Sequence, residues 1–414
     1  MRPRVVVLLV LAGFFLASVA VWAPHGFLRP NDRAIGEAYS AYIGAQNFDL
    51  YGFRFAGLQD ASASPNPADH PVLYVHHPNF GLYVSHALYQ AGVTSLATQN
   101  ALSIVGSVLG LALAYAFARR VTGSEWFALG FTILLAANVE FIVNWSFNIH
   151  RAFTYASVFG TLYALHLWGE AGFVSRVWGA VTFAVAVTLI GTDYMYYFWT
   201  MFAALAMCAL FFDRRTAVRG AVAIILIFGA IFALRQLQVA VGIGPTVWAG
   251  DFVYQVLNRL GLSSLYPVGW LDQTTAFYKT HGVLNPGFSG YVALHERAYH
   301  LVVATGEGVL YALGDLAPNK RLALAVGTVL GGATAWCVYR EGSRDGLSRT
   351  ARFSLMFFVP CIVMALAFPA LFVLWNRAFL LPHICAAAWV ATTFSALLRE
   401  LPILRQALPV MASK

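Results

Sequence analysis

The chain has 414 residues, of which 59% are hydrophobic and only 11% are charged, and its formal net charge is +8. A soluble protein of this size could not cover its surface with so few charges, since soluble chains carry about 25% charged residues. The apolar residues form continuous runs rather than alternating segments of about ten residues, which argues against a membrane β-barrel. Excess Arg at one membrane face accounts for the net charge, so no nucleic-acid partner is implied. We predict an all-α polytopic membrane protein.

The first apolar run predicts a membrane helix that is retained rather than cleaved. It extends from Val5 to Trp22 after a basic start. The apolar region of a secretory signal is about 7–15 residues long and ends at a small-residue cleavage site. This run is longer, and the sequence Ala-Pro-His-Gly that follows it is a poor cleavage site. We therefore expect the N-terminus to lie in the cytoplasm.

Further apolar runs predict about ten transmembrane helices in all, with both termini on the same side of the membrane. Of the 26 Lys and Arg residues, 15 lie on one set of short connections and tails, and the positive-inside rule assigns that set to the cytoplasm. The expected spans are 5–23, 96–118, 126–146, 152–169, 178–192, 195–212, 220–241, 322–339, 353–374 and 378–398.

The spans divide the chain into three parts. Residues 1–240 form a transmembrane module with a first long outer segment at 24–95, residues 241–321 form a second outer segment, and residues 322–414 hold the C-terminal transmembrane helices. Connections of this length usually carry function. Lys320 and Arg321 lie on the outer face in this scheme, against the charge rule, and the partly apolar run that precedes them could enter the membrane.

Two carboxylates mark the beginning of the first outer segment. Asp32 and Glu37 flank the start of a short amphipathic helix that we expect to lie on the membrane surface. The apolar face of this helix would be formed by Ile35, Ala38, Tyr39, Tyr42 and Ile43. Both carboxylates could simply cap the helix and complement its dipole. The functional alternative is a general base held at the membrane surface.

A group of histidines follows in the same segment. His70, His76 and His77 lie close to Asp69, but they lack the helical spacing and the Cys companions that are typical of a zinc site. We therefore predict no metal site, and we expect His76 and His77 to shape a polar pocket that contributes to substrate binding.

The order of these features resembles the GT-C glycosyltransferases, in particular the bacterial protein O-mannosyltransferases and lipid A aminoarabinose transferases. The matching residues begin with Glu37-Ala38-Tyr39, Ala41, Ile43 and Asn47, continue with His76-His77-Pro78-Asn79-Phe80, where that family has a proline segment, and end with Leu109 to Gly123, which includes Tyr115 and Arg119-Arg120. The resemblance covers about residues 1–200, and the remainder agrees only in hydropathy. Two departures are Gly36, where the family has the Asp of an acidic pair, and Asn79, where it has a second proline.

The resemblance implies a GT-C fold and a site on the outer face of the membrane. It implies that Glu37, or Asp32 in place of the missing Asp, deprotonates an acceptor hydroxyl, and that the sugar is transferred with inversion from a polyprenyl-phosphate donor. Enzymes of this type that use a lipid monophosphate do not generally demand a catalytic metal, so we expect no cofactor.

Charged residues near the outer ends of later spans supply further candidates, because such charges usually face an internal cavity. Asp193 lies in an aromatic-rich bend that resembles an Asp-Trp/Tyr turn of the family, and its alternative role is to cap the sixth span. Arg377 and Arg235 suit a lipid phosphate, which Arg can bind with two parallel hydrogen bonds, and His383 is a weaker candidate for the same role. Arg377 could instead be an interfacial anchor.

The sequence therefore predicts a multi-pass glycosyltransferase of the inner (plasma) membrane with its site facing the periplasm or the outside. Its expected partners are a polyprenyl-phosphate-linked sugar, a lipid, glycan or protein acceptor, and membrane lipids. Two alternatives stay open. One is a transporter or flippase of lipid-linked glycans, although no pair of repeated halves with broken helices is evident. The other is a non-catalytic GT-C-like protein that binds lipid.

Overall fold

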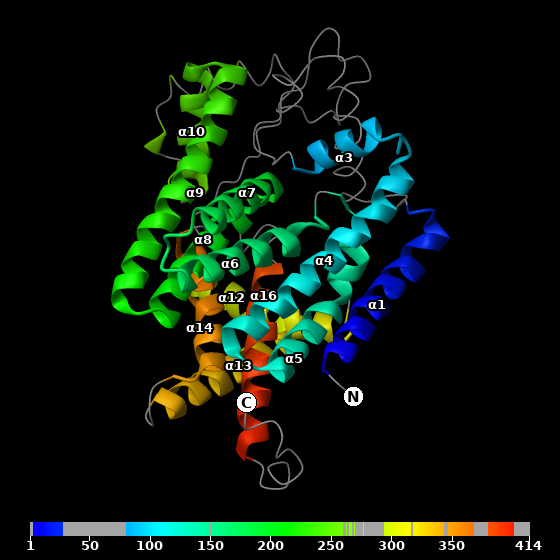
Figure 1. Cartoon of the computed structure of the whole chain (residues 1–414), viewed down its shortest axis with the longest axis vertical. Coiled ribbons are helices and arrows are strands. Elements are labelled where there is room, and N and C mark those ends of the chain that lie inside the picture. The colour runs from blue at the N-terminus through cyan, green and yellow to red at the C-terminus, as the bar shows by residue number, and fades with distance from the viewer. Residues whose placement is uncertain are drawn as a thin grey trace.

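The computed structural model describes residues 3–27, 80–146, 148–149, 151–259, 294–315, 318–342, 347–367 and 380–400, together with 262, 265–266, 269 and 276. Every regular element in these ranges is helical (Figure 1). The elements in chain order are α1 (Pro3–Trp22), η1 (Ala23–His25), α3 (Phe80–Gln90), α4 (Leu96–Thr122), α5 (Glu125–Ala136), the π-helix η3 (Phe141–Trp145), α6 (Thr154–Glu170), α7 (Arg176–Thr192), α8 (Tyr194–Phe211), α9 (Arg214–Ile243), α10 (Pro245–Arg259), α12 (Leu294–Ala312), α13 (Lys320–Gly342), α14 (Arg349–Ala367) and α16 (Leu380–Glu400). The prediction of an all-α protein is confirmed for the described residues.

Five of the described helices are long and apolar enough to cross a membrane. They are Pro3–His25, Leu96–Thr122, Tyr194–Phe211, Arg214–Gly242 and Arg349–Leu366. Shorter apolar helices at Glu125–Ala136, Arg176–Thr192 and Leu381–Leu397 pack among them. The chain is therefore a membrane protein, whereas the count of about ten spans stays a prediction.

The expected span at 126–146 is not one continuous helix. α5 ends at Ala136, and after Asn138 the chain continues as the π-helix η3. The side-chain oxygen of Asn138 accepts a hydrogen bond of 3.1 Å from the backbone N–H of Phe141. Asn favours this kind of local capping over a helix interior, which is the physical reason for the break. The sequence correctly predicts an apolar stretch at 126–146, but it does not predict that the helix is interrupted at Asn138.

The run that precedes Lys320 belongs to the helix bundle. α12 packs against α13, α14 and α16. The contact with α13 depends on Gly306 and Gly327, because a Cβ atom on Gly306 would meet the carbonyl of Ala323 and one on Gly327 would meet the carbonyl of Val302. The two backbones are therefore too close for any larger residue at these positions.

Aromatic side chains form the centre of the bundle. Phe131 of α5 contacts Phe159 of α6 and Phe353 and Phe357 of α14, and Trp199 of α8 stacks on Phe357 with ring centroids 5.5 Å apart. These five side chains come from four helices and are all almost fully buried. The centre is thus packed with rings, and the polar groups described below lie towards the ends of the helices.

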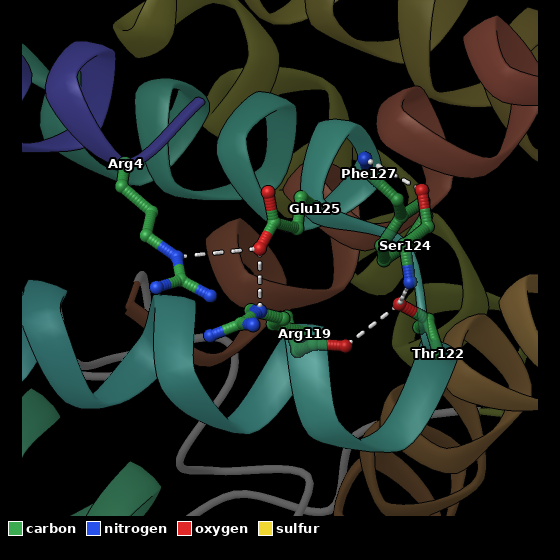
Figure 2. Close-up of polar contacts among 7 residues, drawn as sticks. Arg4, Arg119, Thr122, Ser124, Glu125 and Phe127 are labelled. Atoms are coloured by element: carbon green, nitrogen blue, oxygen red, sulfur yellow. Dashed lines mark hydrogen bonds and ion pairs between the residues drawn. The ribbon is translucent and has the colours of Figure 1, made fainter. Parts of the chain in front are cut away.

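α1 begins and α16 ends at one end of the bundle, and α3 and α10 lie at the opposite end (Figure 1). Figure 2 shows Glu125, at the start of α5, between two arginines: its Oε1 lies 3.0 Å from Nε of Arg119 and 3.5 Å from Nε of Arg4. Arg120, also on α4, pairs with Glu170 at the end of α6, with a distance of 2.7 Å between Nη2 and Oε2. Arg4, Arg119 and Arg120 thus form a basic cluster where α1 begins. The side of the membrane that this cluster faces stays a prediction.

Candidate functional site

A buried ion pair lies at the end of the bundle opposite the basic cluster. Nη1 of Arg151, just before α6, donates a hydrogen bond of 3.0 Å to Oδ2 of Asp193, between α7 and α8. The exposed fraction is 2% for Arg151 and 7% for Asp193. Burial removes both charges from water, which costs free energy. Such charges are stable only when they are paired and hydrogen-bonded.

The other oxygen of Asp193 caps a helix. Oδ1 accepts a hydrogen bond of 2.9 Å from the backbone N–H of Met195, and the residue has the extended backbone expected of an N-cap. Both carboxylate oxygens are therefore engaged by the protein. These two contacts hold Asp193 in a buried position, so the geometry favours a positioning role over that of a general base.

A chain of polar side chains begins at the residue after Asp193. Nε of Arg235 donates to the hydroxyl of Tyr194 at 3.3 Å, and its Nη1 donates to Oε1 of Gln238 at 2.7 Å. The amide nitrogen of Gln238 donates in turn to the hydroxyl of Tyr83 at 3.5 Å. The chain joins α3, α8 and α9, and all four side chains are half-buried. It connects the Arg235 guanidinium to Tyr194, the residue that follows Asp193 in the sequence.

Arg235 and Gln236 are adjacent in the sequence, but their side chains contact different partners. Gln236 faces away from this chain, since its Oε1 accepts a hydrogen bond of 2.9 Å from Nε1 of Trp248 on α10. Gln238, which the sequence analysis did not single out, is the residue that contacts Arg235. The signal was present in the i, i+3 spacing of two polar residues inside an apolar helix.

The first residue of α3 packs beside the ion pair. The ring of Phe80 contacts the ring of Phe153, two residues after Arg151, with centroids 5.5 Å apart. Phe80 also lies against Gly191, where an added Cβ atom would be 2.8 Å from the Cβ of Phe80. Phe80, the last residue of the sequence His76-His77-Pro78-Asn79-Phe80, is therefore fixed next to the C-terminal end of α7, close to Asp193.

His383 lies in a different part of the bundle. Its exposed fraction is 1%, and its Nδ1 donates a hydrogen bond of 2.9 Å to the carbonyl of Gly308 on α12. This contact joins α16 to α12. A side chain held in this way favours a packing role over a phosphate contact.

Several predicted site residues lie outside the described residues, namely Asp32, Glu37, His76, His77 and Arg377. Their roles stay predictions. Within the part of the chain that the structure describes, no group of three or more His, Cys, Asp or Glu residues could hold a metal ion.

Comparison with solved structures identifies the fold. The chain is similar to the oligosaccharyltransferase of Archaeoglobus fulgidus in the apo form, with a TM-score of 0.54 and 14% sequence identity over 99% of this chain and 52% of that chain. A second structure of that enzyme, in complex with Zn and sulfate, gives a TM-score of 0.52 and 14% identity over 97% of this chain and 51% of that chain. The chain thus spans about half the length of the solved proteins that it matches.

No protein-family model matches the chain, and no curated protein matches it by sequence. At this level of identity the likeness shows the fold alone, which resembles that of the oligosaccharyltransferase over about half of that enzyme's length. The expected all-α class is confirmed for the described residues. The narrower resemblance to O-mannosyltransferases and aminoarabinose transferases stays a prediction.

Proposed function

We propose that this chain is a membrane glycosyltransferase that moves a sugar from a polyprenyl-phosphate donor to an acceptor hydroxyl on the outer face of the plasma membrane. The observation that carries the proposal is the likeness of the fold to the oligosaccharyltransferase of Archaeoglobus fulgidus, which covers 99% of this chain. The polar chain around Arg235 supports it, because a guanidinium near the end of a membrane helix suits the phosphate of a lipid donor.

In this proposal the chemistry is divided between two groups of residues. Glu37 or Asp32 removes the proton from the acceptor hydroxyl, which attacks the anomeric carbon of the sugar while the bond to the lipid phosphate breaks. Arg377 and Arg235 stabilise the negative charge that develops on the departing phosphate. The Arg151–Asp193 pair keeps the start of α8, and with it Tyr194 and Arg235, in place.

The proposal is tested by transfer in a defined membrane. The purified protein is reconstituted with synthetic polyprenyl-phosphate sugars, and envelope glycans from cells with and without the gene are compared by mass analysis to identify the sugar and acceptor. We expect transfer of a single sugar with inverted anomeric configuration. Movement of the intact lipid-linked sugar between leaflets without transfer would contradict the proposal and favour a flippase.

A further inference from the structure

Three arginines lie together at the start of α9 on the surface of the protein. Arg214, Arg215 and Arg219 are all exposed, and with Val218 they border a shallow, open hollow of about 510 Å³. Arg215 and Arg219 are one helical turn apart on the same face, where two like charges repel each other unless an anion lies near both. This cluster of three guanidinium groups is therefore suited to a negatively charged ligand.

These arginines differ from the others at the same end of the bundle. Arg119 pairs with Glu125 (Figure 2) and Arg120 pairs with Glu170, whereas no ion pair joins Arg214, Arg215 or Arg219 to a carboxylate within the described residues. Carboxylates of the protein thus neutralise Arg119 and Arg120. The exposed guanidinium groups at the start of α9 are available to an anion from outside the protein.

The carboxylate of Asp213, which precedes these arginines, accepts hydrogen bonds from the first turn of its own helix. Its Oδ1 accepts the backbone N–H groups of Arg215 and Thr216 at 2.9 and 3.2 Å, and its Oδ2 accepts the hydroxyl of Thr216 at 2.7 Å. The hydroxyl of Thr216 and these N–H groups hold the pKa of Asp213 below its usual range. Asp213 thus stays ionised as a cap, and the three arginines still leave this turn with an excess of positive charge.

The face that carries Arg215 and Arg219 continues as an apolar stripe. Val218, Val222, Ile225 and Leu226 follow at helical spacing, and their exposed fractions are 59%, 53%, 56% and 65%. From Arg215 to Leu226 the helix rises about 16 Å, which is close to half of a hydrocarbon core of about 30 Å. The stripe therefore covers the depth of one leaflet, and the arginines lie at the level of its headgroups.

The length of α9 agrees with a position of these arginines at the level of the lipid headgroups. Arg215 and Arg235 are twenty positions apart, so they are separated by about 30 Å along the helix axis. The two arginines therefore lie near opposite ends of the helix.

We propose that Arg214, Arg215 and Arg219 bind the phosphate of an anionic phospholipid whose acyl chains lie along Val218, Val222, Ile225 and Leu226. A lipid is favoured over a soluble anion because the charged hollow and the apolar stripe are continuous on one helix face. The site is independent of sugar transfer, since it lies at the end of the bundle opposite Arg235.

The test compares phospholipid binding to the full-length protein in detergent. Phosphatidylglycerol and phosphatidylcholine are titrated separately, and bound lipid is counted by native mass spectrometry. Each arginine near a membrane surface strengthens the binding of anionic lipid about fivefold. Arg215→Gln/Arg219→Gln should therefore weaken phosphatidylglycerol binding about 30-fold while phosphatidylcholine binding is unchanged. Arg215→Lys/Arg219→Lys should retain most of the preference.

Arg176→Gln is the matched control, because Arg176 is an exposed arginine at the start of α7 near the same end. It should leave the lipid preference unchanged, and Arg219→Gln alone should reduce it. If Arg176→Gln and Arg219→Gln lost the lipid preference equally, the preference would depend only on the net charge of the protein. That result would overturn the proposal. Arginine-dependent binding of inorganic phosphate with the strength of the lipid would overturn it as well.

Discussion

Arg151 and Asp193 are 42 positions apart in the chain, yet their side chains meet at 3.0 Å in the interior of the protein. The pair joins the turn before α6 to the turn between α7 and α8. Its carboxylate also caps α8, so a single aspartate fixes a helix start and neutralises a buried guanidinium. The position of the start of α8, where Tyr194 lies, therefore depends on this contact.

Removing the negative charge should therefore destabilise the protein although the cap survives. Asn caps a helix as well as Asp does, but Asp193→Asn removes the carboxylate that pairs with the buried guanidinium of Arg151, a loss of about 3–5 kcal/mol. Asp213→Asn is the matched control, because Asp213 caps α9 at an exposed position and should tolerate the change. Thermal unfolding in detergent measures both. A double variant Arg151→Met/Asp193→Asn should recover part of the loss, and purely additive effects would show that the two residues do not act as a pair.

The identity of the base can be tested with two isosteric variants. Asp32→Asn and Glu37→Gln each remove one proton acceptor while keeping size and, for Asn, the ability to cap. We expect one of them to lose at least about a hundredfold in sugar transfer per folded molecule with donor binding retained. Glu170→Gln, which removes the carboxylate that pairs with Arg120, serves as the control and should keep normal transfer. Near-normal transfer in both site variants would remove this segment from the catalytic assignment.

The phosphate contact is expected to depend on charge first and on geometry second. Arg377→Ala should slow donor turnover more than Arg377→Lys, because Lys keeps the positive charge but loses the two parallel hydrogen bonds of the guanidinium. Arg235→Ala should raise the KM for the lipid donor if the two arginines share the phosphate. Steady-state kinetics with a short-chain donor measures both effects. Full activity in both Arg377 variants would leave that residue as an interfacial anchor.

The contact between α4 and α6 should be sensitive to a single methyl group. A Cβ atom on Gly110 would lie 2.6 Å from the Cβ of Tyr155 and 2.7 Å from the backbone nitrogen of Ala156. Gly110→Ala is therefore expected to destabilise the protein by about 1–3 kcal/mol through overpacking. Gly130→Ala is the control, since nothing lies within 4 Å of its added Cβ and Ala favours a helix over Gly. Equal unfolding temperatures for the two variants would contradict the close packing of α4 on α6.

Orientation in the membrane can be tested by chemical labelling. A cysteine introduced at 55–68 should react with an impermeant reagent added outside intact cells, and one introduced at 343–348 should react only after the cells are opened. This result follows from the basic residues that cluster on the short connections. The reversed pattern would place the predicted site in the cytoplasm and remove the argument for a lipid-linked donor.

The sequence by itself determined the class of protein and the positions of most helices. Apolar runs predict helices because the backbone groups of a membrane segment must be satisfied within that segment, so run length alone was sufficient for α1, α4 and α9. Run length failed at 126–146, where Asn138 ends α5 inside an apolar stretch. There a local side-chain hydrogen bond competed with the helix, and hydropathy does not measure that competition.

The partners of the polar residues were decided only by the tertiary structure. Asp193 and Arg235 were found as candidates because charges in apolar surroundings are costly and therefore conspicuous in a sequence. What they contact could not be deduced, since Arg151 and Asp193 lie in different turns and Arg235 and Tyr194 on different helices, and helix packing sets their distances. For the same reason His383, which the sequence allowed as a phosphate ligand, is instead held against Gly308 of α12. A buried polar group takes the nearest partner that the packing provides, and that choice is made by residues far away in the chain.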